Sequence, residues 1–316
     1  MTNRTYDVAI IGGGPAGLSA ALVLGRARRR VVVVDAGTPR NAPAAHMQGF
    51  LSHDGTPPAE LLRAAREEVR RYGVEIVEDR VEGAAAGFAL RLGGGRTLQA
   101  RKLLLATGAA DELPDVRGAR ARWGRDLLHC PYCHGWEVRD QPIGVLASVE
   151  HAHLLRQWTD DVILFAHTAV VTTPEREALQ ARGIAVVDGT VEELVVADDR
   201  LQGLRLADGR TLARRALFIR PALRAHADGL AAALGCESQD DGLVRADAAG
   251  RTTVPGVWAA GNATNPRAQV ITAAGEGSAV AIAINTELVA DDLDSAVQHV
   301  ATTTAARPPT RDPRIP

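Results

Sequence analysis

The stretch that decides the fold is DVAIIGGGPAG, residues 7–17, near the start of the chain. Its apolar first half is typical of a strand buried in a parallel sheet, and the residues that follow it have helical composition. Between the two, Gly12 allows a tight turn, Gly14 lets the backbone approach a pyrophosphate, and Gly17 lets the helix pack close to the strand. The spacing predicts a strand, a nucleotide-binding loop and a helix.

The residues around this loop fit the same unit. Pro15 and Ala16 belong to the loop, and the N-terminus of the helix expected at 18–26 would face the negative charge of a bound phosphate. A second apolar run, VVVV at 31–34, ends in Asp35 and Ala36. A carboxylate at the end of that strand can accept the ribose hydroxyls of an adenosine. Strand, loop, helix and acid together favour a dinucleotide site.

Length and charge narrow the classes of protein to consider. The chain has 316 residues, enough for two domains that each bury a core, and its net charge is −2 with acidic and basic residues interspersed. That balance indicates neither nucleic-acid binding nor a polybasic membrane surface, so we expect small molecules as partners. No apolar run reaches the roughly 18 residues that a membrane helix needs. The polar first residues lack a leader pattern, so we expect a cytoplasmic protein.

Two later strands end in short motifs that indicate which nucleotide binds. LLLATG at 103–108 ends in Ala106, Thr107 and Gly108, whereas VWAAGN at 257–262 ends in Gly261 and Asn262 and is followed by Gln269 and Val270. In this order the motifs resemble the signatures of flavoproteins with two dinucleotide folds. Over most of its length the chain resembles the low-molecular-weight thioredoxin reductases, and more closely the dithiol oxidases of holomycin and gliotoxin biosynthesis.

That resemblance implies an α/β fold with two dinucleotide-binding, Rossmann-like domains, FAD as cofactor and a homodimer. The FAD domain would be discontinuous, at residues 1–114 and 245–316, and a degenerate NAD(P)H-type domain at 115–244 would carry a redox cysteine pair. Asn262 stands where the family usually has an aspartate that binds the ribityl chain, and His46 could equally be a polar loop residue. The positions implied as FAD contacts are Gly12, Gly14, Pro15, Ala16, Gly17, Asp35, Ala36, Arg40, Asn41, His46, Val81, Ala106, Thr107, Gly108, Gly261, Asn262, Gln269 and Val270.

A second glycine loop is missing where NADPH-dependent reductases carry one. The strand PIGVL at 142–146 leads into ASVEHA at 147–152, which has no glycine. Val149 would place a β-branched side chain where bare backbone is needed, and Glu150 would add a negative charge near two phosphates. The strand that follows ends in AHTA, residues 166–169, without an arginine for a 2′-phosphate. We predict that NADPH binding is lost.

For the cysteine motif HCPYCH, residues 129–134, three interpretations compete with a redox-active dithiol. A c-type haem site would require export, and a zinc site would need two further ligands, for which Cys236 and one histidine are a poor match. Two inert buried thiols conflict with Pro131 and with the flanking histidines, which make the surroundings polar and titratable. We therefore expect a redox-active dithiol and no metal.

The resemblance also implies a role for each residue of this motif. Cys133 would lie against the flavin, and Cys130 would exchange with the substrate's sulfur. His134 occupies the place of the thioredoxin reductases' acid and suits a base for an incoming thiol. His129 could share that work or stabilise the thiolates when charged.

The sequence thus predicts an FAD-dependent dithiol oxidase of natural-product or antibiotic biosynthesis, which forms an intramolecular disulfide in a small-molecule dithiol. Electrons would pass from the cysteine pair to FAD and then to molecular oxygen, giving hydrogen peroxide. Two alternatives remain: a thioredoxin reductase-like disulfide reductase driven by NADPH or another donor, and a self-protection flavoprotein that binds its disulfide ligand with little turnover.

Overall fold

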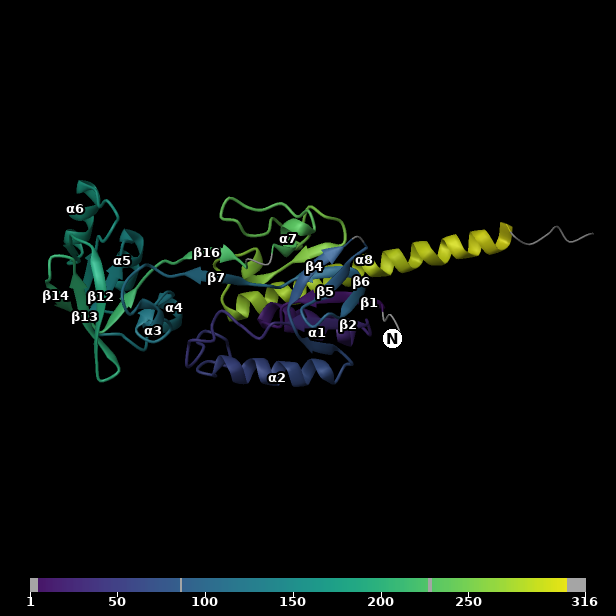
Figure 1. The fold of residues 1–316 in the computed structure, drawn as a ribbon, viewed down its shortest axis with the longest axis horizontal. Coiled ribbons are helices and arrows are strands. Elements are labelled where there is room, and N and C mark those ends of the chain that lie inside the picture. The colour runs from purple at the N-terminus through teal and green to yellow at the C-terminus, as the bar shows by residue number, and fades with distance from the viewer. Residues whose placement is uncertain (1–4, 86, 227–228, 306–316) are drawn as a thin grey trace, which may run out of the picture.

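The computed structural model describes residues 5–85, 87–226 and 229–305. Its ribbon is elongated, with two separate groups of strands along the long axis and a long helix, α8, that projects from one end (Figure 1). The ends of the predicted FAD domain, residues 1–4 and 306–316, lie outside the described residues.

The first sheet contains seven described strands in the order β3-β2-β1-β6-β5-β4, with β17 paired to the second half of β6. Strands β1, β2, β3, β6 and β17 run parallel, and β4 and β5 form an antiparallel extension. Every residue of β1 after Thr5 is buried, as its apolar sequence predicts. The strands are β1 (Thr5–Ile11), β2 (Val31–Asp35), β3 (Glu75–Glu78), β4 (Val81–Ala85), β5 (Ala89–Leu92), β6 (Thr97–Leu105) and β17 (Val257–Ala259).

The two faces of this sheet have separate cores because alternate residues of a strand point to opposite sides. Val8 and Ile10 of β1 pack with apolar residues of α1, α2 and α8. Ala9 and Ile11 pack on the other face, together with Leu230 of the short helix α7. The helices around the sheet are α1 (Pro15–Arg26), α2 (Pro58–Arg70), α7 (Leu230–Ala233) and α8 (Val270–Ala305).

The second sheet has five described strands, all parallel, in the order β11-β10-β9-β15-β8. Helices α5 and α6 cover one face, and the antiparallel sheet β12-β13-β14 covers the other. The elements are α3 (Ala119–Arg122), β8 (Leu127–Leu128), α4 (Pro131–His134), β9 (Ile143–Leu146), α5 (Val149–Leu155), β10 (Val162–Phe165), α6 (Thr173–Ala181), β11 (Ala185–Val187), β12 (Val191–Ala197), β13 (Arg200–Leu206), β14 (Thr211–Ala213) and β15 (Ala216–Phe218).

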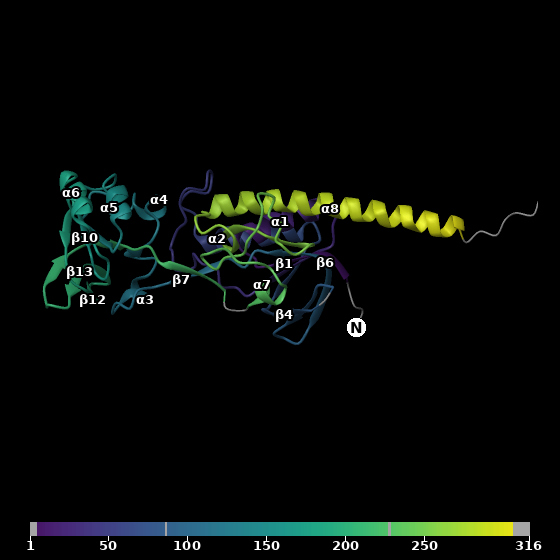
Figure 2. The ribbon, with the colours of Figure 1, turned by 90° about the horizontal axis from the view of Figure 1, so that it is seen from above.

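A two-stranded antiparallel ribbon, β7 (Ala109–Glu112) with β16 (Ala222–Ala225), connects the two groups (Figures 1 and 2). The chain leaves the first sheet along β7 and returns along β16. Leu230, Cys236 and Val244 already pack in a core of the first sheet, ahead of the predicted return at residue 245. We therefore propose the ribbon itself as the boundary between the two domains.

The far part of α8 extends beyond the sheet that its first turns cover (Figure 2). Large apolar side chains on this part are exposed, among them Val289, Leu293 and Val297. Within the described ranges, no helix combines the length and the apolar character needed to cross a membrane.

Gly277 of α8 lies where this helix crosses α1. A Cβ atom added to Gly277 would lie 2.0 Å from the carbonyl oxygen of Ala16, which no side chain can tolerate without backbone movement. Gly275, one half-turn away and exposed, has nothing within 4 Å of an added Cβ among the described residues. The crossing therefore requires glycine at only one of these two positions.

We expect Gly277→Ala to lower the free energy of unfolding by about 1–3 kcal/mol, because the methyl group overpacks the helix crossing. The matched control Gly275→Ala should keep or raise stability by up to about 1 kcal/mol, through higher helix propensity. Denaturant titration followed by circular dichroism measures both variants. Equal losses for the two would show that the close approach at Gly277 is not a constraint.

Candidate functional site

The loop between β1 and α1 has the geometry of a phosphate cradle. A Cβ on Gly12, which has φ +108°, would lie 2.2 Å from the carbonyl oxygen of Ala106, and a Cβ on Gly17 would lie 1.9 Å from the carbonyl oxygen of Gly12. These two glycines are required by packing alone. Gly14 differs, because an added Cβ would meet no described atom within 4 Å. Its side of the loop is open, and no described side chain caps the N-terminus of α1.

A cavity of about 330 Å³ starts at this loop and reaches the cysteine pair. Its volume is in the range of small-molecule sites. Of the predicted FAD contacts, Gly17 does not line the cavity, because it packs beneath the loop. The residues that do line it are Gly12, Gly14, Pro15, Ala16, Asp35, Ala36, Arg40, Asn41, His46, Val81, Ala106, Thr107, Gly108, Gly261, Asn262, Gln269 and Val270, together with His129, Cys130, Cys133 and His134.

Asp35 ends β2 at the cavity, as the sequence predicted, but it has a partner that the sequence did not reveal. Arg66 of α2 donates to its Oδ2 at 2.5 Å, and the backbone N–H of Gly37 donates to its Oδ1 at 3.3 Å. Arg66 belongs to a helix with several arginines, and nothing in their spacing distinguishes it. The ion pair fixes the carboxylate at the strand end, where a ribose could reach it.

Asn262 uses its amide group in a way that an aspartate could not. Its Nδ2 donates to the carbonyl oxygens of Asn265 at 2.9 Å and Ala268 at 3.1 Å, and its Oδ1 accepts a hydrogen bond from Arg40 at 3.2 Å. A carboxylate has no proton to donate to the two carbonyls. The amide therefore holds the loop that leads into α8, in addition to facing the cavity.

Arg40 is also paired with Asp111 of β7, which the sequence analysis did not single out. Its Nε and Nη2 donate to the two carboxylate oxygens at 2.8 and 2.6 Å. The side chain of Asp111 is only 6% exposed, so solvent screens this bidentate pair weakly. The pair ties the cavity loop to the connecting ribbon.

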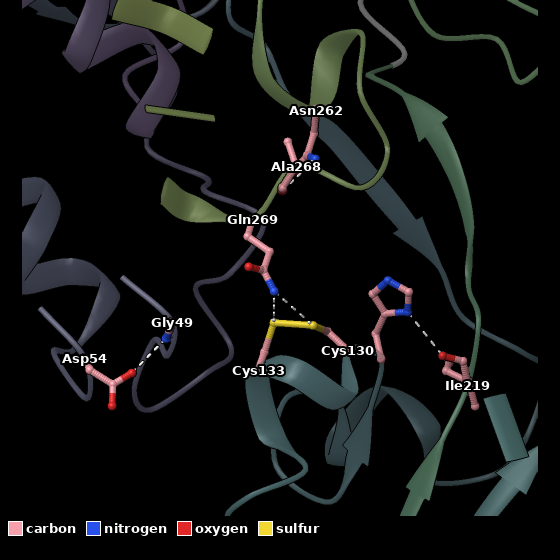
Figure 3. Close-up of a disulfide and its surroundings, with 9 residues drawn as sticks. Gly49, Asp54, Cys130, Cys133, Ile219, Asn262, Ala268 and Gln269 are labelled. Carbon is pink, nitrogen blue, oxygen red and sulfur yellow. Dashed lines mark hydrogen bonds between the residues drawn. A yellow bond between two sulfur atoms is a disulfide. The ribbon is translucent and has the colours of Figure 1, made fainter. Parts of the chain in front are cut away.

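Cys130 and Cys133 form a disulfide at the cavity wall, with their Cα atoms 5.2 Å apart (Figure 3). Helix α4 begins at Pro131 and places the second cysteine one turn after the first. The amide nitrogen of Gln269, just before α8, lies 3.8 Å from each sulfur. The loop of Gly49, whose N–H donates to Asp54 at 2.7 Å, lies nearby in Figure 3.

Both histidines of the motif line the cavity and are largely neutral in their environment. Burial lowers the pKa of His134, whose Nδ1 has no hydrogen-bond partner in the described structure. Burial also lowers the pKa of His129, which is partly offset by a hydrogen bond of its Nδ1 to the carbonyl oxygen of Ile219 at 3.2 Å. Neutral imidazoles can accept protons from thiols. Across the described ranges, no group of three His, Cys, Asp or Glu side chains could hold a metal ion.

The second loop, which lacks the glycines, begins with the same backbone hydrogen bond as the first. The two loops differ at the N-terminus of the helix that follows. The N–H of Ala147 donates to Phe165 of the neighbouring strand at 2.8 Å, as the N–H of Gly12 does to Val34 at 2.8 Å. Helix α5 then begins two residues after Ala147, and the hydroxyl of Ser148 accepts the N–H of His151 at 3.3 Å. A side chain thus occupies one of the free N–H groups of the helix N-terminus where an intact loop would bind a phosphate.

Two further contacts occupy the surroundings of this second loop. Glu150 pairs with Arg220, so the acid is held beside the start of α5. At the end of the next strand, His167 accepts the backbone N–H of Val191 at 3.1 Å through its Nδ1. Neither group provides a positive charge for a phosphate.

The chain matches the pyridine nucleotide-disulphide oxidoreductase family over residues 6–277, and it belongs to that family. Its relatives include thioredoxin reductase sirT of Leptosphaeria maculans, 32% identical over 91% of this chain and 96% of that protein. Thioredoxin reductase tcpT of Claviceps purpurea is 34% identical over 92% and 96%. The crystal structure of HlmI, 53% identical, superposes with a TM-score of 0.91 over 95% of this chain and 98% of that one. The predicted thioredoxin reductase-like fold with two Rossmann-like units is confirmed, and the protein is an oxidoreductase of this type.

The open space at Gly14 makes a sharp prediction. Gly14→Val should fold normally, because the residue has extended dihedrals and no described neighbour of an added Cβ, but it should purify without flavin. Gly12→Val should instead fail to fold, because its side chain meets the Ala106 carbonyl. Flavin absorbance and thermal unfolding by circular dichroism separate the two. A yellow Gly14→Val protein would refute the cradle.

Proposed function

We propose that the protein is an FAD-dependent dithiol oxidase that closes a disulfide in a small-molecule dithiol, with molecular oxygen as acceptor. One observation carries this proposal: the two nucleotide loops of the chain differ. The loop at Gly14 is open and shares a cavity with the disulfide, whereas the loop at Ser148 is closed by its own side chains. A site for the flavin without a site for NADPH favours electron flow from thiols to oxygen.

The residues of the first loop fit FAD. The open side of Gly14 and the uncapped N-terminus of α1 suit a pyrophosphate, and Asp35 suits a ribose. Gly108 and Gly261, both at positive φ, follow β6 and β17 and line the cavity with bare backbone. When bound, FAD supplies a two-electron acceptor for the reduced cysteine pair, with oxygen as terminal acceptor and hydrogen peroxide as its product.

The residues around the disulfide have different proposed roles: the cysteines exchange with the substrate's sulfurs, and the histidines accept protons. A substrate thiolate attacks the sulfur of Cys130, the bond between Cys130 and Cys133 breaks, and its electron pair remains on Cys133. The second substrate thiolate attacks the sulfur bound to Cys130, which closes the substrate disulfide and releases the Cys130 thiolate. His134 and His129 are the proposed acceptors of the two thiol protons, since both line the cavity and both have lowered pKa values.

A second candidate function is a disulfide reductase, because the relatives sirT and tcpT carry the name thioredoxin reductase. In that case NADPH or another donor would reduce the flavin, and the cysteine pair would reduce a substrate disulfide. The Ser148 cap and the pair of Glu150 with Arg220 argue against NADPH in particular.

Anaerobic spectroscopy distinguishes these directions. Because the second loop is closed, NADPH should leave the flavin absorbance unchanged and should show no binding heat by calorimetry. A dithiol such as dithiothreitol should bleach the flavin, and admission of air should restore the colour and release hydrogen peroxide. Rapid bleaching by NADPH would instead support the reductase. Bleaching by neither reagent would favour a binding protein with little turnover.

The order of the two cysteines is tested with oxidised glutathione on the flavin-loaded protein. Cys133→Ser should form a stable mixed disulfide at Cys130, since the resolving thiol is absent. Cys130→Ser should react at least about tenfold more slowly, because Cys133 is the thiol covered by the flavin. Intact mass spectrometry follows both adducts, and both variants should lose dithiol turnover. Equal labelling rates would reverse or remove the proposed assignment.

A further inference from the structure

His151 is a buried histidine that none of the chemistry above uses. It lies in the first turn of α5, is 7% exposed, and does not line the cavity. Ser148 accepts its backbone N–H, but its ring Nδ1 is buried and has no hydrogen-bond partner in the part of the chain that is described. Such a buried, unpaired polar atom in a native protein calls for an explanation.

The ring of His151 packs against His129. Their centroids are 6.1 Å apart and their planes are inclined by 49°. His129 Nδ1 faces the carbonyl oxygen of Ile219 at 3.2 Å. A carbonyl can only accept, so Nδ1 must carry the proton in this bond, and Nε2 of the neutral ring is then the unprotonated nitrogen.

The charges near the two rings are arranged in pairs. Arg40 is bound to Asp111 on the side of the ribbon, and Arg220 is bound to Glu150 on the side of α5. His134 is a further titratable neighbour of His129. Burial is the largest influence on the pKa of His129 and lowers it; Arg40 and Arg220 lower it further, whereas Asp111 and the hydrogen bond to Ile219 raise it. Burial also lowers the pKa of His151, to about 4, so that ring is neutral at physiological pH.

We propose that His151 is a positioning residue: its ring excludes water behind His129 and keeps that ring against the Ile219 carbonyl, whose hydrogen bond fixes the Nδ1–H tautomer, so that Nε2 is free to accept the proton of a substrate thiol. This inference rests on the dithiol-oxidising function proposed above. The proton moves from the thiol sulfur to Nε2 of His129. The resulting thiolate bonds to the sulfur of Cys130, and the electron pair of the broken disulfide bond remains on Cys133.

The position of His151 gives the degenerate loop a use. In the first unit, the start of α1 is left open toward the cavity. In the second unit, the start of α5 is capped by Ser148 and its first turn carries the histidine that backs His129. In an intact loop the N-terminus of α5 would face a phosphate, whereas here it supports the thiol site.

The test compares His151→Ala with His151→Phe, with His153→Ala as a control on the same helix. Ala opens space that water can enter, whereas Phe keeps a ring of similar size. Histidine-labelled, oxidised, flavin-loaded protein is studied by ¹H–¹⁵N NMR, which reports protonation and tautomer of each ring. The His129 signals are assigned with His129→Gln. No dithiol is present, so the result does not depend on oxidase activity.

In His151→Ala we expect the His129 titration to move up by about one pH unit and its tautomers to mix, since hydration favours the cation. In His151→Phe and His153→Ala the Nδ1–H tautomer and the low midpoint should persist. In a separate experiment with dithiol, the rate at which the dithiol reduces the protein should fall at low pH. The midpoint of this fall should move with the NMR midpoint of His129 in each variant. An unchanged His129 in His151→Ala would overturn the proposal, as would a His151→Phe protein that behaves like His151→Ala.

Discussion

The site depends on one steric constraint, the close approach of three backbone segments around Ala16. A Cβ on Gly17 would collide with Gly12 beneath the loop, and one on Gly277 would collide with the carbonyl of Ala16 from α8. Gly261, at the end of β17, lies close enough that its Cβ would be 3.0 Å from the Cβ of Ala16. Because the glycines at these contacts have no side chain, α1, α8 and the end of β17 can converge at one point. The cavity floor is built from that convergence.

The two nucleotide-type units share the strand end that precedes their loops and differ mainly at the N-terminus of the helix that follows. Both begin with a strand whose next residue, Gly12 or Ala147, donates to the neighbouring parallel strand. Ala147 tolerates a positive φ of 55°, which costs a non-glycine residue some strain. What differs is the helix N-terminus. At α1 its N–H groups remain available to an anion, and at α5 the hydroxyl of Ser148 takes one of them.

The sequence was sufficient for features that local pattern determines. The run at 7–17 predicts strand, loop and helix because a continuous apolar run, glycine spacing and helix composition are properties of neighbouring residues. The partners Arg66 of Asp35, Asp111 of Arg40 and His151 of His129 were missed, because they come from elements far apart in the chain and carry no spacing rule. The packing of Leu230 in the first core could not be read from the sequence for the same reason, and the predicted return at residue 245 stays a prediction.

Electrostatics around the sulfurs follows from these distant contacts. Arg40 and Arg220 are each bound to a carboxylate, so neither presents a free charge to the disulfide. The polar group that reaches both sulfurs is the neutral amide of Gln269, 3.8 Å from each. An amide N–H can donate to whichever sulfur carries negative charge, but it stabilises a thiolate less than an ammonium or guanidinium would. We propose that a thiolate held this weakly stays a good electron donor, and that the histidines beside it take up the protons. The division suits a site that must be reduced and reoxidised in every turnover.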